Sequence, residues 1–244
     1  MVITIGTDCS GIEAPIQALI QLKIPYKQLW SCDIDSYARK SAEANYPKPE
    51  RVYHDIMDRN HKELPHVDIY VCGFPCQSFS MAGKRLGTAD PRASVIGAMV
   101  ETINQVKPKI IILENVKGFR SIEDGKPMKD LVAILEKQYN VNVSIYNTKK
   151  YGLPQNRERI YFVGIRKDVQ KKDFVKPKEV KMKPLSSIVD SSIRNETCSI
   201  KQNLLNKIRF NDKATYNIIN IAFLSSNNSP VASNDFSPTL ITRH

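Results

Sequence analysis

Residues 67–80 read Val-Asp-Ile-Tyr-Val-Cys-Gly-Phe-Pro-Cys-Gln-Ser-Phe-Ser. The first six are rich in β-branched and apolar residues, which predicts a buried strand of a parallel sheet. Cys76 follows at the carboxyl end of that strand, where α/β sheets bind their ligands. Pro75 fixes its own φ and favours an extended Phe74, so Cys76 is presented at a defined angle. A thiol there is either a nucleophile, if a nearby positive charge lowers its pKa, or a small buried apolar side chain.

Strands alternate with helices through the first two-thirds of the chain. We expect strands at 2–7, 28–32, 51–53, 67–72, 110–113, 141–146 and 160–165, and helices at 15–22, 36–45, 94–106 and 128–137. Strands separated by helices are joined by crossover connections, which are right-handed in almost all proteins. The pattern therefore predicts an α/β fold with a doubly wound, mostly parallel, Rossmann-like sheet.

The regular pattern ends near residue 166. We expect an α/β domain at 1–166, a basic linker at 167–184, and a region at 185–244 that is too small for a core of its own. The net charge is +11, and residues 121–244 carry 21 Lys/Arg against 12 Asp/Glu, whereas residues 1–120 carry 15 against 13. This uneven charge favours a polyanionic partner, nucleic acid before membrane, although solvation of a loop also explains a lysine run.

The cysteines and the apolar segments bear on the cellular compartment. The five cysteines have no metal-ligand spacing, which predicts reduced intracellular thiols and no metal site. Apolar runs stay well short of the roughly 18 residues that a membrane helix needs, and Met1 leads directly into a strand. We therefore expect neither a membrane span nor a signal peptide, and a cytoplasmic location.

Side chains suited to a nucleotide-like ligand follow the first three strands. The small-residue turn at Gly6–Pro15 is either a structural turn or a cofactor site, and it lacks the Gly-x-Gly-x-x-Gly fingerprint. Asp33, at the tip of the second strand, is placed to grip ribose hydroxyls, while Asp35 better fits a helix N-cap. Asp55, after the third strand, is placed to accept a hydrogen bond from an adenine amino group.

Charged residues also stand at the ends of the later strands. Glu114 follows the most apolar strand, and burial would raise its carboxyl pKa and make it a proton donor; a solvated glutamate is the alternative. Arg157 and Arg159 precede the last strand, and alternation puts both on one face. Two such guanidiniums bind either an oxygen-rich ligand or carboxylates in a surface salt-bridge ladder.

The order of these segments resembles that of one family. Thr-Asp-Cys-Ser-Gly-Ile, Asp-Ile-Asp, Gly-Phe-Pro-Cys-Gln-Ser-Phe-Ser, Asp-Pro-Arg-Ala-Ser, Glu-Asn-Val and Pro-Gln-Asn-Arg-Glu-Arg-Ile-Tyr occur in the order and spacing of the cytosine-5 DNA methyltransferases. The resemblance covers residues 3–166 and returns at 237–240. It implies the fold of S-adenosylmethionine-dependent methyltransferases, with 1–166 as the catalytic and cofactor-binding domain and 185–244 as a short, incomplete target-recognition region.

The resemblance also implies a reaction. The enzyme would transfer a methyl group from S-adenosylmethionine to carbon 5 of cytosine in duplex DNA, through a covalent adduct of Cys76 with a flipped-out base. Glu114 would hold and protonate the ring nitrogen, Arg159 would hold the base carbonyl, and Arg157 would steady the site near Cys76. The setting would be nucleoid DNA in a bacterial or phage-infected cell, as in restriction–modification.

The remaining roles follow residue by residue from the same resemblance. The expected donor-binding residues lie at the strand tips: Cys9, Gly11, Ile12, Asp33, Ile34, Asp55, Ile56, Gly73, Pro75 and Val95. The expected DNA contacts belong to a mobile loop at residues 78–91: Ser80, Lys84 and Arg85.

Two departures from the family pattern matter. Glu13 and Ala14 stand where the first motif usually has glycines. Neither an Arg-Pro-Arg segment nor a Gly-Asn-Ser turn occurs after the last strand. We therefore expect a second polypeptide to supply the missing motifs, unless the chain is a truncated form. Two rival hypotheses stay open: a non-catalytic module that binds donor or DNA, and a tRNA methyltransferase, although the Cys-Phe-Thr tripeptide of that branch is missing.

Overall fold

The computed structural model describes residues 2–75, 95–187 and 237–238 of the chain. The chain divides into two compact units, each of which is described by itself. The first contains Met1–Ile145 and Arg159–Val175, and the second contains Tyr146–Glu158 and Lys176–His244. The domain boundaries predicted from the sequence, at residues 166 and 184, remain a prediction.

The first unit is built around a seven-stranded sheet in the order β3-β2-β1-β4-β5-β8-β6. Its strands are β1 (Ile3–Asp8), β2 (Tyr26–Cys32), β3 (Arg51–Tyr53), β4 (Ile69–Cys72), β5 (Ile110–Val116), β6 (Tyr139–Asn147) and β8 (Glu158–Arg166). The chain runs from β1 outward to β3 and then returns to β4 on the other side of β1. Ligands of such sheets bind outside the carboxyl ends of the strands at this reversal.

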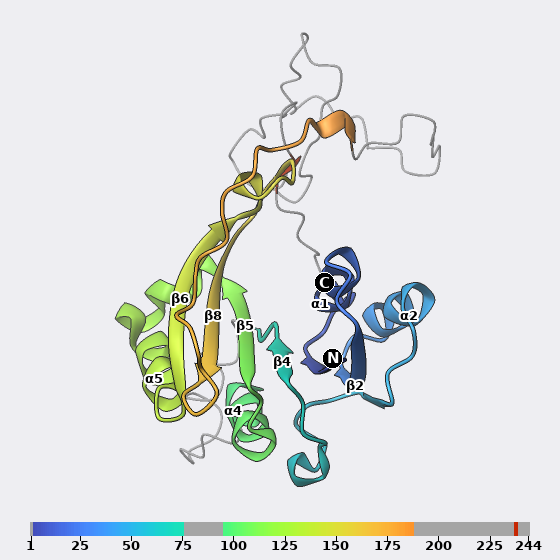
Figure 1. The fold of residues 1–244 in the computed structure, drawn as a ribbon, viewed down its shortest axis with the longest axis vertical. Coiled ribbons are helices and arrows are strands. Elements are labelled where there is room, and N and C mark those ends of the chain that lie inside the picture. The colour runs from blue at the N-terminus through green and yellow to red at the C-terminus, as the bar shows by residue number, and fades with distance from the viewer. Residues whose placement is uncertain (1, 76–94, 188–236, 239–244) are drawn as a thin grey trace, which may run out of the picture. The chain divides into compact units, whose positions relative to one another are not determined.

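In the described part of the chain, four α-helices cover the sheet: α1 (Ala14–Gln21), α2 (Ser36–Asn45), α4 (Val95–Val106) and α5 (Lys126–Leu135). Figure 1 shows α1 and α2 next to β2, and α4 and α5 next to the end of the sheet that holds β5 and β6. Pro15 lies in the first turn of α1, where a missing N–H costs no hydrogen bond. Asp35 caps α2 as predicted, because its carboxylate accepts hydrogen bonds from the backbone of Tyr37 and Ala38.

The pairing of the sheet is parallel except at β8. Strands β1, β2, β3, β4 and β5 pair in parallel, as expected. Strand β8 pairs with β5 in the antiparallel direction, which the expected, mostly parallel sheet allows. A parallel crossover usually needs a helix, whereas the chain between β6 and β8 holds only the 3₁₀ turn Thr148–Lys150 and the two-residue strand β7.

The core of this unit lies between the sheet and its helices. Its largest fully buried side chains include Trp30, Tyr70, Phe74 and Met99, and in a smaller cluster Ile16 and Leu19 of α1 pack with Ile5 of β1. Gly6 makes room for Trp30, because an added Cβ at residue 6 would lie 2.2 Å from Trp30 Cζ2. None of the helices in the described part of the chain combines the length and apolar character needed to cross a bilayer.

The second unit is described over shorter stretches. Strand β7 (Gln155–Asn156) pairs in parallel with β9 (Ser237–Pro238), and an isolated bridge joins Tyr151 to Val180. An ion pair joins Lys150 Nζ to Glu179 Oε1 at 2.8 Å. Among the described residues, the remaining regular segments are 3₁₀ turns: His61–Glu63 and Lys117–Gly125 in the first unit, and Thr148–Lys150 and Leu185–Ser187 in the second.

Candidate active site

Glu114 and Arg159 form an ion pair across two neighbouring strands. Arg159 Nε lies 2.9 Å from Glu114 Oε1, and both side chains are only partly exposed. The sequence placed Glu114 just after a strand at 110–113. Strand β5 continues to Val116, so Glu114 lies inside the strand. The antiparallel register places Arg159 opposite Val116 and Tyr161 opposite Glu114. The reversed direction of β8 therefore brings the guanidinium to the carboxylate.

Gly73 lies beside this pair, at the tip of β4. A Cβ added at Gly73 would lie 3.6 Å from Glu114 Oε2 and 3.3 Å from the carbonyl oxygen of Cys9. The Gly73 N–H donates to the carbonyl of Asp8, the last residue of β1, at 3.3 Å. Three residues predicted separately, Cys9, Gly73 and Glu114, thus lie together at the carboxyl edge of the sheet.

The backbone that leads to Cys76 is anchored by a residue that the sequence analysis did not assign. Asn115 is buried, and its side-chain amide donates to the carbonyl of Phe74 at 3.0 Å. The Phe74 ring is also buried and contacts Phe119 edge to face, with 5.3 Å between the ring centroids. A polar residue directly after Glu114, next to a buried strand, was the signal that could have revealed Asn115.

The turn after β1 and the tip of β2 are joined by Asp33. The Gly11 N–H donates to Asp33 Oδ2 at 2.7 Å, and the Asp35 N–H donates to Asp33 Oδ1 at 2.8 Å. Gly11 has a φ of 53°, a conformation that favours glycine. Ile12 and Ile34, on either side of this contact, expose 63% and 76% of their surface. Two exposed apolar side chains beside a carboxylate suit a ligand that is part sugar and part apolar ring.

These residues fit the methyl donor that the sequence analysis expects. Each Asp33 oxygen already accepts one backbone N–H, and a carboxylate oxygen can accept a further hydrogen bond from a ribose hydroxyl. The absence of a side chain at Gly73 leaves space between Cys9 and Glu114 that a larger residue would fill. Ile56 is buried, Asp55 is half-buried, and Val95 is the half-buried first residue of α4.

A second group of residues that the sequence analysis did not assign surrounds Asp8. Arg59 Nη1 donates to Asp8 Oδ1 at 2.6 Å, Arg59 Nη2 pairs with Asp8 Oδ2, and both side chains are almost fully buried. The Tyr70 hydroxyl donates to Asp8 Oδ2 at 2.6 Å, and Trp30 Nε1 donates to Asp8 Oδ1 at 3.1 Å. Arg59 and Asp8 are 51 positions apart, so no local spacing reveals this pair.

Glu13 explains one departure from the family pattern. Its φ is 59°, so it adopts the left-handed conformation that a glycine would adopt more easily. Its side chain is buried, and Oε1 accepts hydrogen bonds from the Thr7 hydroxyl at 2.8 Å and from Gln28 Nε2 at 2.9 Å. Burial raises the pKa of the Glu13 carboxyl, and nearby hydroxyl groups offset this only in part. The Glu13 side chain therefore forms hydrogen bonds inside the unit.

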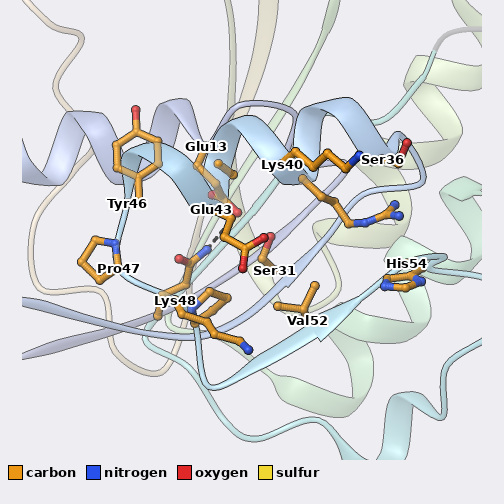
Figure 2. Close-up of a pocket in the computed structure, with 14 residues that line it drawn as sticks. Glu13, Ser31, Ser36, Lys40, Glu43, Tyr46, Pro47, Lys48, Val52 and His54 are labelled. Atoms are coloured by element: carbon orange, nitrogen blue, oxygen red, sulfur yellow. Dashed lines mark hydrogen bonds between the residues drawn. The ribbon is translucent and has the colours of Figure 1, made fainter.

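Glu13 also borders a cavity between α2 and the strands β2 and β3. The cavity has a volume of about 330 Å³, and Figure 2 shows Lys40 and Glu43 of α2 across from Ser31 and Val52. None of the donor-binding or catalytic residues predicted from the sequence lines it. This cavity is therefore separate from the group of predicted residues at the strand tips.

Several predicted residues fall elsewhere. Cys76, Ser80, Lys84 and Arg85 lie outside the described residues, as does the whole of the predicted loop at residues 78–91. Arg157 belongs to the second unit and lies between β7 and β8, so strand alternation does not set the direction of its side chain. Over residues 2–75, 95–187 and 237–238, no three His, Cys, Asp or Glu side chains gather as a metal site would require.

Comparisons with known proteins point to one family. The family model described as C-5 cytosine-specific DNA methylase matches residues 8–238. The type II methyltransferase M1.ScrFI of Lactococcus lactis subsp. cremoris is 38% identical over 172 residues, which make up 67% of this chain and 44% of that protein. M.HaeII of Haemophilus aegyptius is 39% identical over 167 residues, 68% of this chain and 51% of that protein. The chain thus spans about half the length of these relatives.

Solved structures share the fold. The S. pombe Dnmt2 methyltransferase matches with a TM-score of 0.68 and 22% identity, over 84% of this chain and 66% of that chain. The Entamoeba histolytica methyltransferase EhMeth matches with a TM-score of 0.66 and 21% identity, over 84% of this chain and 65% of that chain. At these identities, the likeness shows a common Rossmann-like α/β architecture.

Proposed function

Because the chain belongs to the family of C-5 cytosine-specific DNA methylases, we propose that it transfers a methyl group from S-adenosylmethionine to carbon 5 of cytosine in duplex DNA. The observation that carries this proposal is the Glu114–Arg159 pair beside Gly73, at the carboxyl edge of the sheet. Two complementary charged groups at that place provide the hydrogen bonds that a pyrimidine edge requires.

The pair matches the polar edge of cytosine. The ring presents an amino group and a ring nitrogen side by side, with a carbonyl oxygen on the other side of that nitrogen. Glu114 accepts from the amino group and, when protonated, donates to the ring nitrogen. Arg159 donates to the carbonyl oxygen. Both contacts draw electron density from the ring while carbon 5 gains carbanion character, which lowers the barrier to reaction.

Cys76 supplies the nucleophile in this proposal. Its thiolate adds to carbon 6, which makes carbon 5 nucleophilic enough to take up a methyl group. Removal of the carbon 5 proton then re-forms the double bond and expels the thiolate. The anchored Phe74, held by Asn115 at 3.0 Å, supports a fixed approach to Cys76. Arg157 is proposed to steady the site near Cys76.

The methyl donor is proposed to lie across the strand tips. S-adenosylmethionine supplies an electrophilic methyl group when it is bound. Cys9, Gly11 and Ile12 would line its methionine part, Asp33 and Ile34 its ribose, and Asp55 and Ile56 its adenine. Gly73, Pro75 and Val95 would close the pocket. The Gly11–Asp33 hydrogen bond of 2.7 Å supports this assignment, because it holds the first two of these walls together.

The target base must leave the duplex to reach this site. A stacked cytosine hides carbon 6, so the proposal includes rotation of the base out of the helix. Ser80, Lys84 and Arg85 are proposed to contact the DNA backbone as the loop at residues 78–91 closes over the site.

Part of the proposed activity depends on a portion of the relatives that this chain does not cover. The chain covers only 44% and 51% of the lengths of two relatives, so the rest of those proteins has no counterpart in the match. We propose that a second polypeptide supplies it. Strong, site-specific methylation by the chain alone would contradict this part of the proposal and leave the chemistry intact.

The Cys76→Ser variant tests the proposed chemistry. Methyl transfer to duplex DNA should be abolished because a hydroxyl is a far weaker nucleophile than a thiolate, while folding and donor binding persist. Cys198→Ser is the matched control and should methylate as the wild type does. The measurement is transfer of a radiolabelled methyl group, with transfer RNA as a second substrate. Persisting transfer by Cys76→Ser would refute the mechanism, and transfer to RNA alone would favour the tRNA alternative.

A trapping experiment tests the covalent step directly. A duplex oligonucleotide with 5-fluorocytosine at the target has no carbon 5 proton to lose, so the thioether to Cys76 cannot be released. The wild type should form a stable protein–DNA adduct in the presence of donor, and Cys76→Ser should form none. Binding without any adduct in the wild type would favour the non-catalytic alternative.

A further inference from the structure

We propose that Arg59 is a positioning residue for the methyl donor. It would hold the Asp55–Ile56 segment against the tips of β1 and β4 through its buried pair with Asp8. Arg59 is not itself proposed to touch the donor. The inference deepens the proposed function, because it concerns the same donor site.

The first observation is where the two partners lie in the chain. Asp8 ends β1 and immediately precedes Cys9, and its backbone carbonyl accepts the Gly73 N–H at 3.3 Å. Arg59 follows Asp55 and Ile56 in the short segment after β3. Within this segment, the Met57 N–H donates to Asp55 Oδ1 at 2.8 Å, which folds it into a tight turn. Arg59 is thus the attachment point of the proposed adenine-side wall.

The second observation is that the pair is bidentate and enclosed. Both Arg59 terminal nitrogens contact Asp8, and Arg59 Nη2 also donates to the Thr102 hydroxyl at 2.8 Å. The guanidinium carbon lies 6.0 Å from the centre of the Trp30 ring and 5.4 Å from that of Tyr53. Burial alone would lower the pKa of Arg59, but the hydrogen bonds and charge of Asp8 outweigh it and raise the pKa. The guanidinium therefore stays charged.

The third observation is that the contacts converge from four elements. Asp8 receives hydrogen bonds from Trp30 of β2 and from Tyr70 of β4, which precedes Gly73 by three residues. Thr102 belongs to α4, which begins at Val95, and its hydroxyl also donates to the Ala98 carbonyl at 3.0 Å. The walls that begin at Cys9, Asp55, Gly73 and Val95 are thus joined to one buried carboxylate.

Arg59→Lys is the decisive variant. Lysine keeps the charge but has a shorter side chain and a single ammonium group, so it cannot make the rigid bidentate contact. The Asp55–Ile56 segment can therefore shift. Donor affinity, measured by calorimetry on the full chain, should fall about tenfold or more. The KM for the donor should rise with little change in kcat at saturating donor. The emission of Trp30, the single tryptophan of the chain, should shift because its partner Asp8 moves.

Two further variants make the test independent of folding defects. Arg51→Lys changes an exposed arginine of β3, just before this segment, and should bind donor as the wild type does. Thr102→Val removes, at constant shape, the hydroxyl that accepts from Arg59 and that also contacts His61 and Ala98, and donor affinity should fall about two- to fivefold. This variant decides the matter if Arg59→Lys does not fold cooperatively.

The outcomes separate the inference from the proposed function. A folded Arg59→Lys whose donor affinity stays within about twofold of the wild type, or a Thr102→Val variant with unchanged affinity, overturns the positioning role. A loss of thermal stability with unchanged affinity would show a purely structural role and also overturns it. A wild-type chain that binds no S-adenosylmethionine refutes the proposed function itself, and this inference with it.

Discussion

Glu13 shows how a residue with a side chain can occupy a turn position whose backbone conformation favours glycine. Its backbone keeps the left-handed conformation, with φ of 59°, at a cost of roughly 1 kcal/mol or more for a residue with a Cβ. The side chain turns into the interior, where Thr7 and Gln28 donate to it. These hydrogen bonds offset part of the backbone strain and part of the cost of burying a carboxyl group.

The raised pKa of Glu13 predicts a dependence of stability on pH. A carboxyl whose pKa is higher in the folded than in the unfolded state stabilises the fold below its ordinary pKa, and that contribution is lost as the pH rises through the folded value. Glu13→Gln removes the titration. The free energy of unfolding of the wild type should therefore fall relative to Glu13→Gln as the pH rises above about 4, the ordinary pKa of a glutamate, as measured by denaturant titration.

The control for this prediction is Glu43→Gln, an exposed position of α2 on the border of the same cavity. Its stability should follow the wild-type trend with pH. A constant difference between wild type and Glu13→Gln over the whole range would show that Glu13 has the same pKa in both states.

At the scale of elements, the contact between β1 and β2 depends on a glycine, Gly6, which has no side chain. Gly6 lies against the ring of Trp30, whose indole N–H is held by Asp8 at 3.1 Å. The ring therefore has little freedom to move away. The same strand pair carries the two tips where the donor is proposed to bind, so close packing here sets the shape of that edge.

Gly6→Ala tests this packing. A Cβ at 2.2 Å from Trp30 Cζ2 forces either the ring or the strand to shift, and overpacking of this kind costs about 1–3 kcal/mol. The free energy of unfolding should fall by that amount in denaturant titration. Gly118→Ala is the matched control, since an added Cβ there meets nothing within 4 Å and should change stability by less than about 0.5 kcal/mol. Equal effects of the two changes would contradict the packing argument.

The sequence predicted the elements better than their directions. The helix at 36–45 matches α2, and the short strand expected at 51–53 matches β3, because capping residues and β-branched runs are local signals. The antiparallel direction of β8 was not predicted. The signal was present, since 147–157 holds no predicted helix for a crossover, but alternation within a strand says nothing about its partner.

Of the candidate site, the sequence predicted the residues and not their contacts. Cys9 and Gly73 were expected from the family resemblance and Glu114 also from its place near a strand end; the structure brings the three together, and their roles remain a prediction. The Asp8–Arg59 pair and the Asn115–Phe74 hydrogen bond were missed, because they join residues 51 and 41 positions apart. Only the folded sheet makes these residues neighbours.

For the whole molecule, the charge distribution bears on how DNA is bound. Most of the excess of positive charge belongs to residues 121–244, and lysines are dense at 167–183. Lysines that approach phosphates release counterions, so affinity falls steeply with salt. The proposed DNA substrate therefore gives a role to a stretch that contributes nothing to the core.

The double variant Lys171→Gln, Lys172→Gln tests this role. Both lysines are exposed, and their replacement should weaken DNA binding and reduce the slope of log affinity against log salt by about 2, one for each phosphate that is no longer neutralised. Lys23→Gln, Lys62→Gln is the control from the less basic half and should leave the slope unchanged. The measurement is fluorescence anisotropy of a labelled duplex over a salt series. Equal slopes for both pairs would assign DNA binding to other residues.

The Glu114–Arg159 ion pair has a consequence for discrimination among bases. At 2.9 Å the two groups are paired with each other before a base binds. Binding of a base therefore exchanges their mutual contact for contacts with the base. A pyrimidine that forms hydrogen bonds with both Glu114 and Arg159 makes the exchange favourable. A base that forms hydrogen bonds with only one of the two groups would leave the other charge unpaired and away from water, at a cost of several kcal/mol. On the proposed function, the resting pair thus sets a threshold that thymine, with a carbonyl where cytosine has its amino group, cannot reach.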